Sequence, residues 1–311
     1  MKHPGADQHV NDTNSGFDAT TPLAREIAEL TRRRQVIASN ELPKPEKTRV
    51  LTISNQKGGV GKTTTAVNLA AALARQAAKV LVIDLDPQGN ASTALGVEHH
   101  SEVTSVYDVI VGDVPLSDVV QRSPEPGELF CVPATIHLAG AEIELVSMVA
   151  REQRLRRALD LHLKEMTAPY DYVFIDCPPS LGLLTINAFV AAREVLIPIQ
   201  CEYYALEGLS QLLKNIELIE KHLNPDLTVS TILLTMYDGR TNLANQVAQD
   251  VREHFPEQVL KTLIPRSVRV SEAPSYGQSV VSYDLNSAGS LSYLEAAAEI
   301  ARRGAPQTGN V

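Results

Sequence analysis

From about residue 48 onward, the chain alternates short apolar runs with longer amphipathic stretches. Several short runs are almost wholly apolar, which is typical of parallel strands covered by helices on both faces. Between them lie helical patterns such as Leu206, Leu209, Leu213 and Ile216, whose spacing turns one apolar stripe toward a sheet. The alternation predicts an α/β fold with a doubly wound, mainly parallel sheet, helices on both faces, and ligands at the carboxyl ends of the strands. The expected strands are 50–54, 80–84, 129–133, 172–176, 195–200, 229–236 and 259–264.

The first 47 residues are expected to form an extension. Residues 1–20 carry almost no large apolar side chains, so they cannot offset the entropy of ordering and we expect disorder. Helical spacing then predicts one short helix at about 22–38, followed by a proline-containing linker. Its Thr-Arg-Arg-Arg run at 31–34 could touch DNA, a partner or a dimer neighbour, but is more typical of a solvated helix face. A globular domain at 48–304 and a flexible tail at 305–311 complete the expected organisation.

Composition narrows the function classes. With 311 residues and 44% apolar content, the chain can fill a large core, as one α/β domain or two. A formal charge of -9 argues against a protein that coats nucleic acid with its whole surface, so any such contact needs a local basic patch. The three cysteines lie far apart and indicate a reducing cytoplasm. Because no apolar run approaches the roughly 18 residues of a membrane span, we expect a cytoplasmic protein with no membrane partner.

Residues 55–65 read Asn-Gln-Lys-Gly-Gly-Val-Gly-Lys-Thr-Thr-Thr, between an expected strand and a helical run. This order suits a phosphate-binding loop, because glycines let backbone N–H groups turn toward phosphate oxygens at a helix N-terminus. In this interpretation Lys62 reaches the β- and γ-phosphates and Thr63 is a ligand of Mg²⁺. The ordinary motif has glycine where Gln56 stands, and here a second lysine, Lys57, precedes the glycine pair.

Two further segments place carboxylates at strand ends. Asp84 and Asp86 precede a Pro and Gly turn, where a carboxylate can orient an attacking water or hold Mg²⁺ through water. Asp176 ends the apolar run 172–176, which is the Walker B form that positions Mg²⁺ in P-loop enzymes. A lone acid after such a strand is usually a helix cap, but the three segments together favour Asp176 as part of a metal site. Cys177 is expected to be a small buried residue.

With these segments the chain resembles the ParA/MinD superfamily, whose deviant Walker A loop carries the additional lysine. Segments 202–208, 237–243 and 264–274 strengthen the resemblance to ParA proteins, especially the chromosomal subgroup often called Soj. The resemblance covers residues 49–303. It implies an ATP- and Mg²⁺-dependent sandwich homodimer that partitions chromosomes or plasmids and binds double-stranded DNA without sequence preference. A ParB-type centromere-binding protein would stimulate its ATP hydrolysis.

The resemblance also implies residue roles. Lys57 would cross the dimer interface to the partner's nucleotide, and Asp86 would activate water, whereas Asp84 would be structural or support its neighbours. The expected catalytic residues are Lys57, Lys62 and Asp86. The expected metal ligands are Thr63, Asp86 and Asp176. The expected nucleotide contacts are Lys57, Gly58, Gly59, Val60, Gly61, Lys62, Thr63, Thr64 and Pro265.

DNA contacts are expected on arginines in the C-terminal half, because the resemblance matches Arg240 and Arg269, with Arg266 and Lys261 as neighbours. Clustered cations supply phosphate contacts even on an acidic protein. The alternative for any one of them is an ordinary surface or helix-end cation. We expect a nucleoid-associated protein.

Three other functions are alternatives to a partitioning ATPase. A membrane-cycling ATPase like MinD needs a basic amphipathic C-terminal helix, whereas Leu291, Leu294 and Ile300 indicate a last packing helix. A cluster-carrying reductase like nitrogenase iron protein needs paired cysteines, but Cys177 and Cys201 lack the Gly-rich context. A nucleotide-gated binding module with negligible turnover cannot be separated from a slow ATPase by sequence.

Overall fold

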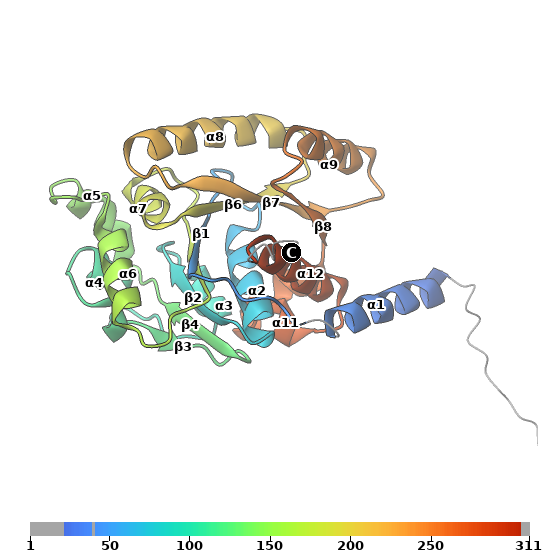
Figure 1. The fold of residues 1–311 in the computed structure, drawn as a ribbon, viewed down its shortest axis with the longest axis horizontal. Helices are drawn as coiled ribbons and strands as arrows, with labels where there is room; N and C mark the ends of the chain where they lie inside the picture. The colour runs from blue at the N-terminus through green and yellow to red at the C-terminus, as the bar shows by residue number, and fades with distance from the viewer. Residues whose placement is uncertain (1–21, 39–40, 306–311) are drawn as a thin grey trace, which may run out of the picture.

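An eight-stranded sheet forms the centre of the computed structural model, which describes residues 22–38 and 41–305 (Figure 1). Its order is β3-β4-β2-β5-β1-β6-β7-β8, and every neighbouring pair is parallel except β3 with β4. The mainly parallel α/β fold expected from the sequence is confirmed. The expectations for residues 1–20 and for 306–311 lie outside the described residues. The strands are β1 (Arg49–Ile53), β2 (Lys79–Asp84), β3 (Gln121–Arg122), β4 (Glu128–Val132), β5 (Tyr172–Asp176), β6 (Glu194–Gln200), β7 (Thr228–Tyr237) and β8 (Val259–Pro265).

Helices cover both faces of the sheet, and each face has its own apolar core, because side chains alternate between faces along each strand. Leu51 and Ile53 of β1 face one core, for example, and Val50 faces the other. The first core includes α2 (Lys62–Arg75), α3 (Asn90–Ala94), α10 (Val268–Glu272), α11 (Val280–Tyr283) and α12 (Ala288–Arg303). The second includes α4 (Val106–Ile110), α5 (Leu138–Leu145), α6 (Arg154–Glu165), α7 (Leu183–Ala191), α8 (Ala205–His222) and α9 (Asn242–His254). The short 3₁₀ helices are η1 (Leu116–Asp118) and η2 (Ala273–Tyr276).

Each of the seven expected strands is present, with ends that differ by a residue or so. The additional strand, β3, has only two residues and pairs antiparallel with β4 at the edge of the sheet. Two residues are too few to show a hydrophobic period, so sequence reasoning had no signal for it.

Helix α1 (Pro22–Ala38) packs against α12. Arg33 holds it there, since its Nε and Nη2 atoms each donate a 2.7 Å hydrogen bond to Glu295, and Nη2 also donates to Ser292 Oγ at 3.0 Å. The hydrogen bond to Glu295 is the main cause that raises the pKa of Arg33. The interpretation of the 31–34 run as a solvated face is therefore wrong for Arg33, whose guanidinium docks the helix.

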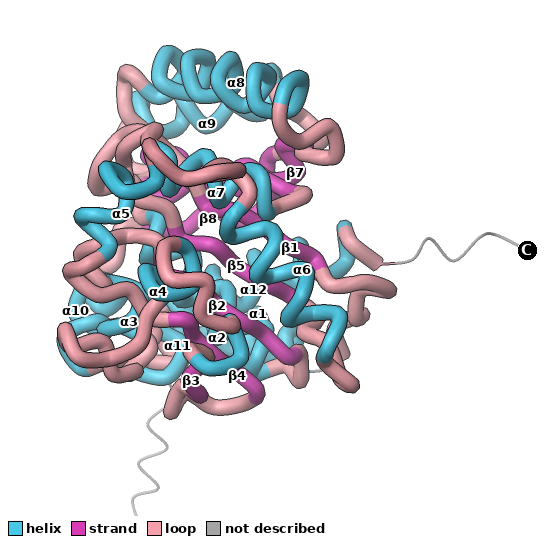
Figure 2. Tube along the Cα trace, turned by 90° about the vertical axis from the view of Figure 1, so that its left-hand side faces the viewer, coloured by secondary structure: helices cyan, strands magenta, loops and turns pink. Residues whose placement is uncertain are grey.

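The register of the sheet brings the expected site segments to one edge. Asp84 at the end of β2 pairs with Asp176 at the end of β5, and Ile53 of β1 is level with the same aspartate. Because parallel strands end at the same edge, the loops after these strands are neighbours. The helices that follow the carboxyl ends of β2, β4 and β8 are α3, α5 and α10, and they lie on the left of Figure 2.

Candidate functional site

The loop between β1 and α2 has the backbone of a phosphate cradle. Gly59 and Gly61 have φ angles of 75° and 88°, a left-handed conformation that glycine adopts without steric cost. Gly61 is also the N-cap of α2, and no side chain caps the first N–H groups of that helix. These unpaired donors and the positive end of the helix macrodipole favour an anion at this point.

Two anchors that the sequence analysis did not identify hold the loop. Asn55 Nδ2 donates to the Pro198 carbonyl of β6 at 2.8 Å, while its Oδ1 accepts from the Lys57 N–H. On the next strand over, Thr235 Oγ1 of β7 donates to the Val60 carbonyl at 2.8 Å. Such anchors become visible only when the strand order is known, because it places β6 next to β1 and β7 next to β6.

Lys62 is buried at the first position of α2, where its Nζ donates to the Lys57 carbonyl at 3.2 Å. Burial lowers its pKa, and the nearby Asp176, Cys177 and Asp86 act in the opposite direction. An ammonium group has three N–H donors, so this one can still serve an anion in the cradle.

Lys57 and Gly58 lie on the exposed rim of the loop. Lys57 Nζ donates to Glu202 Oε2, on the loop after β6, in a half-exposed ion pair of 2.5 Å. A Cβ added to Gly58 would meet no atom within 4 Å. The chain's own packing therefore leaves room for a side chain at residue 58.

Asp84 and Asp176 are both fully buried beside the cradle, but they differ in their partners. Asp84 accepts hydrogen bonds from the N–H and Oγ of Ser92 and from the Asp86 N–H, and burial raises its pKa to about 6. Neither oxygen of Asp176 has a hydrogen-bond partner of normal distance and angle, although the Thr63 hydroxyl lies close enough to act on its pKa in the lowering direction. Burial, and next the charge of Asp84, raises the pKa of Asp176 well above its usual range.

The unpartnered Asp176 carboxyl fits a cation site, because a buried acid without partners is unfavourable unless a ligand completes it. Among the described residues, no group of three or more His, Cys, Asp or Glu side chains could hold a metal ion by themselves. That is compatible with Mg²⁺, which is commonly bound through one or two carboxylates together with substrate phosphates and water. The donor set of Asp176, Asp86 and the Thr63 hydroxyl therefore fits Mg²⁺ accompanied by a phosphate ligand.

Asp86 lies half-buried on the turn after β2, and its Oδ1 accepts from the Gln88 N–H at 3.0 Å.

Pro265 ends β8 and is level with Tyr237 of β7. The N–H of the adjoining Arg266 donates to the Tyr237 carbonyl at 3.1 Å. Thr64 lies within the first turn of α2. The structure thus places the expected nucleotide residues on loops and helix ends along one edge of the sheet.

The three expected DNA-contacting arginines lie on segments that follow β7 and β8, and all are exposed. Arg240 makes a bidentate pair with Asp238 and thereby lowers the pKa of that carboxyl to about 2. Arg269 pairs with Glu272 and Asp284 and lies over the Tyr283 ring. A phosphate group would therefore compete with these acids for both guanidinium groups.

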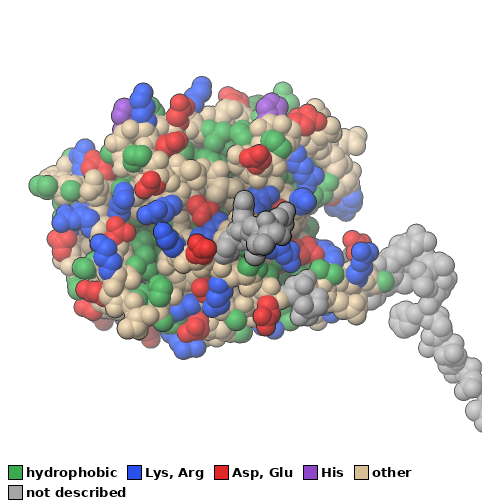
Figure 3. Space-filling model, viewed as in Figure 1, with side chains coloured by type: hydrophobic (Ala, Val, Ile, Leu, Met, Phe, Trp, Pro, Cys, Tyr) green, Lys and Arg blue, Asp and Glu red, His purple; other side chains and the backbone are tan. Residues whose placement is uncertain are grey.

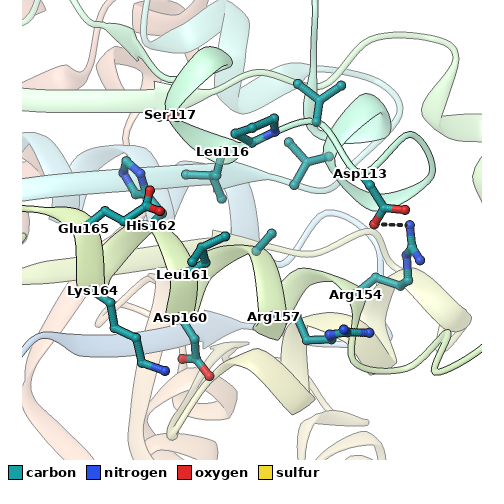
Figure 4. Close-up of a pocket in the computed structure, with 14 residues that line it drawn as sticks. Asp113, Leu116, Ser117, Arg154, Arg157, Asp160, Leu161, His162, Lys164 and Glu165 are labelled. Atoms are coloured by element: carbon teal, nitrogen blue, oxygen red, sulfur yellow. Dashed lines mark ion pairs between the residues drawn. The ribbon is translucent and has the colours of Figure 1, made fainter.

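A surface cavity of about 710 Å³ lies elsewhere, between α6 and the segment that follows α4 (Figure 4). Its lining includes an ion pair of 2.6 Å between Arg154 Nη2 and Asp113 Oδ1. None of the expected nucleotide residues lines it. This cavity therefore does not coincide with the candidate chemistry.

The cysteines and the last helix bear on the other functions. Cys177 and Cys201 are buried and free, and burial raises the pKa of their thiols to about 12 and about 11. The interpretation of Cys177 as a small buried residue is confirmed. Helix α12 is a packing helix, since its apolar residues belong to the core beside α2. No helix within the described ranges is long and apolar enough to cross a membrane.

Comparisons with known proteins identify the family. The family model described as an AAA domain matches residues 48–229. The sporulation initiation inhibitor protein Soj of Bacillus subtilis is 53% identical over 256 residues, which are 82% of this chain and 99% of that protein. The chromosome partitioning protein ParA of Myxococcus xanthus is 51% identical over 260 residues, or 84% and 90% of the two chains. This chain belongs to the Soj/ParA family of chromosome-partitioning ATPases.

A solved structure with the same fold is described as cobyrinic acid a,c-diamide synthase from Mycobacterium smegmatis with bound ADP and magnesium. It is 38% identical to this Soj/ParA-family chain, with a TM-score of 0.71, and the match covers 85% of this chain and 97% of that one. The synthase activity in that description is not carried over, because the relatives with higher identity are partitioning proteins.

Proposed function

We propose that this chain is a nucleoid-associated partitioning ATPase in which ATP and Mg²⁺ bring two copies together and hydrolysis separates them. One observation carries the proposal: the buried Asp176 carboxyl, whose oxygens have no hydrogen-bond partner of normal geometry, lies beside Thr63 in the uncapped first turn of α2 and beside the Lys62 ammonium. That combination suits a triphosphate with its metal ion. Residues 48–304 would form the ATPase unit, with 1–47 as an extension and 305–311 as a tail.

Within the site, the N–H groups from Gly58 to Thr64 and the Lys62 ammonium would hold the phosphates, and Pro265 would border the nucleotide. Thr63, Asp86 and Asp176 would hold Mg²⁺. When bound, Mg²⁺ would offset the negative charge that develops on the phosphate oxygens. Asp86 would also orient the attacking water, since its half-buried position leaves one carboxylate oxygen, Oδ2, without a partner in its own turn.

Lys57 would reach the nucleotide of a second copy. Its ion pair with Glu202 is half-exposed, and such pairs contribute only about 0 to 1 kcal/mol. A pair that weak can be exchanged for contacts to phosphate oxygens when a partner approaches. The exposed rim of Lys57 and Gly58 is the surface through which this exchange would occur.

Gly58→Val tests the dimer. The variant should bind ATP, because a Cβ at this position meets no atom of its own chain within 4 Å. It should stay monomeric, because a branched side chain would block close approach of the two phosphate loops. Light scattering with ATP and with ADP measures the association, and calorimetry measures nucleotide affinity. A full ATP-dependent dimer in this variant would contradict the placement of the interface.

The DNA-binding surface is proposed to include Arg240, Arg266 and Arg269, with Lys261 nearby. Changing Arg240 or Arg269 to Glu should weaken binding to any duplex alike, with ATP binding and basal hydrolysis intact. The logarithm of DNA affinity falls linearly with the logarithm of salt concentration, and each lost phosphate contact should make that slope shallower by about 0.9. A salt titration of DNA affinity in the presence of ATP measures both effects.

Arg156→Glu is a matched control, because Arg156 is a surface arginine on α6 that pairs loosely with Asp160 at 3.8 Å. If both test variants bind DNA like the wild type, the DNA surface lies elsewhere, and the exposed Arg32 of α1 becomes the next candidate.

Bivalency supports DNA binding by a chain of charge -9, because a dimer presents each cationic patch twice to one duplex. Stimulation by a ParB-type partner completes the proposed cycle.

A further inference from the structure

The Asp84 carboxylate joins the two ends of the segment 86–92, which runs from the turn after β2 into α3. Its Oδ1 accepts a hydrogen bond from the Asp86 N–H at 3.1 Å, and its Oδ2 accepts one from the Ser92 N–H at 2.8 Å. The turn that carries Asp86 is therefore closed around a single carboxylate.

The Ser92 hydroxyl completes the surroundings of that carboxylate. Its Oγ donates to Asp84 Oδ2 at 2.7 Å and accepts from the Ala134 N–H at 3.1 Å. A hydroxyl can donate one hydrogen bond and accept others, so the two bonds do not compete. Because Ala134 lies on the loop after β4, Ser92 fixes Asp84 relative to β4 as well as to α3.

These hydrogen bonds are shielded from water, because Asp84, Ser92 and Ala134 are all fully buried. The Lys, Arg, Asp and Glu side chains that Figure 3 shows on the surface interact across water and dissolved ions, which weaken their attraction. A buried carboxylate has no such water to replace a lost donor. Each of the three donors to Asp84 therefore restrains its position strongly.

The position of Asp86 depends on this cluster. Asp84 holds the Asp86 N–H, and the Asp86 carbonyl accepts from the Gly89 N–H at 2.9 Å. The Gln88 N–H donates to Asp86 Oδ1 at 3.0 Å. With the backbone and one carboxylate oxygen held, the turn determines where Oδ2 lies. Loss of the Ser92 hydroxyl would release the Asp84 carboxylate from one of its three donors, and the Asp86 backbone would lose part of its support.

We infer that Ser92, acting through Asp84, is a positioning residue for ATP hydrolysis, and that it sets where the Asp86 carboxylate lies relative to the phosphate loop. The inference rests on the proposed function, in which Asp86 orients the attacking water. In this assignment Ser92 contacts neither the nucleotide nor the metal ion. Its loss should therefore lower the rate of hydrolysis and leave the binding of Mg·ATP unchanged.

The test measures single-turnover hydrolysis by the full chain and, by calorimetry, its affinity for Mg·ATP. Ser92→Ala should hydrolyse ATP about 10- to 100-fold more slowly, because a misplacement of about 1 Å can slow a reaction by about 100-fold. Its affinity for Mg·ATP should stay within about twofold of wild type. Asp84→Asn has nearly the same shape but one acceptor oxygen in place of two, so it should show the same split between rate and affinity, and it replaces Ser92→Ala if that variant is unstable. Ser92→Thr keeps the hydroxyl and should retain most of the wild-type rate.

A double variant separates positioning from a general structural role. In Asp86→Ala no carboxylate is left to position, so adding Ser92→Ala should slow hydrolysis no further. Ser123→Ala is the matched control, because Ser123 is also buried and its Oγ also donates once and accepts once. Its partners are the Leu95 carbonyl at 2.7 Å, at the far end of α3, and the Glu125 N–H at 3.2 Å. Ser123→Ala should hydrolyse ATP at the wild-type rate.

Four results would overturn the inference. Wild-type rates in both Ser92→Ala and Asp84→Asn would show that the cluster does not position Asp86, and a slow Asp86→Ala measured beside them would leave the proposed function standing. A loss of Mg·ATP affinity as large as the loss of rate would make Ser92 a binding residue. Independent effects in the double variant, or an equal loss in Ser123→Ala, would show a general effect on the fold. Wild-type hydrolysis in Asp86→Ala would remove the proposed role of Asp86 and the inference with it.

Discussion

Lys62→Ala should weaken binding of Mg·ATP about 100-fold or more, which corresponds to about 2.8 kcal/mol at 25 °C. The loss is large because Lys62 is a buried point charge at the N-terminus of α2, and backbone N–H groups cannot replace an ammonium on the β- and γ-phosphates. Calorimetry measures the affinity, with the exposed Lys214→Ala on α8 as the control for loss of a lysine. Unchanged affinity in Lys62→Ala would remove Lys62 from the site.

The same variant should make the nucleotide-free protein more stable or leave it unaffected. Burial lowers the folded-state pKa of Lys62, so the charged ammonium costs stability at every pH below that lowered pKa, including pH 7. Removing the charge removes that cost, partly offset by the cavity that alanine leaves. Chemical denaturation without nucleotide therefore distinguishes a lost binding group from a misfolded protein, because a misfolded variant would unfold at lower denaturant concentration.

Asp86→Ala should bind ATP and dimerise but hydrolyse ATP about 10²- to 10⁴-fold more slowly, the range expected when a general base is lost. The phosphate cradle is built from β1, α2 and the anchors on β6 and β7, none of which depends on the Asp86 side chain. Single-turnover hydrolysis measures the effect without product release. Glu98→Ala, on the exposed segment after α3, controls for removal of a nearby carboxylate. A wild-type rate in Asp86→Ala would assign water activation to another group.

The sequence predicted the architecture well, because the strands are buried on both faces and their apolar runs are unmistakable. The run 172–176 is an example, since all five residues are buried. The same reasoning placed Asp84 and Asp176 at strand ends. It could not show that the two carboxyls are direct neighbours, which follows from the pairing of β2 with β5.

What sequence reasoning missed depends on contacts between distant segments. The Thr235 bond to the phosphate loop joins residues 175 positions apart, and Asn55 reaches Pro198 across 143. The partner of Lys57, Glu202, was part of a recognised segment, but nothing in its spacing indicated an ion pair. Sequence reasoning also could not predict that Ile143 and Val149 are exposed, because an apolar residue in a helical segment is expected in the core until the fold shows which side it faces.

The contrast between Asp84 and Asp176 also needed the structure. From sequence both are acids at the end of an apolar strand, yet Ser92 donates two hydrogen bonds to Asp84, whereas the oxygens of Asp176 have no partner of normal geometry among the described residues. This difference separates a structural carboxyl from a candidate metal ligand, and no periodicity or motif encodes it.

The central claim is that an ATPase cycle is coupled to DNA and a partner, and the steady-state ATPase rate tests it most directly. The rate should be measured for the wild-type chain alone, with duplex DNA, with a ParB-type protein from the same genome, and with both. We predict slow hydrolysis by the chain alone and a marked increase when DNA and the partner are both present, an increase that Asp86→Ala abolishes. A rate that DNA and partner leave unchanged, or hydrolysis that persists in Asp86→Ala, would contradict the account.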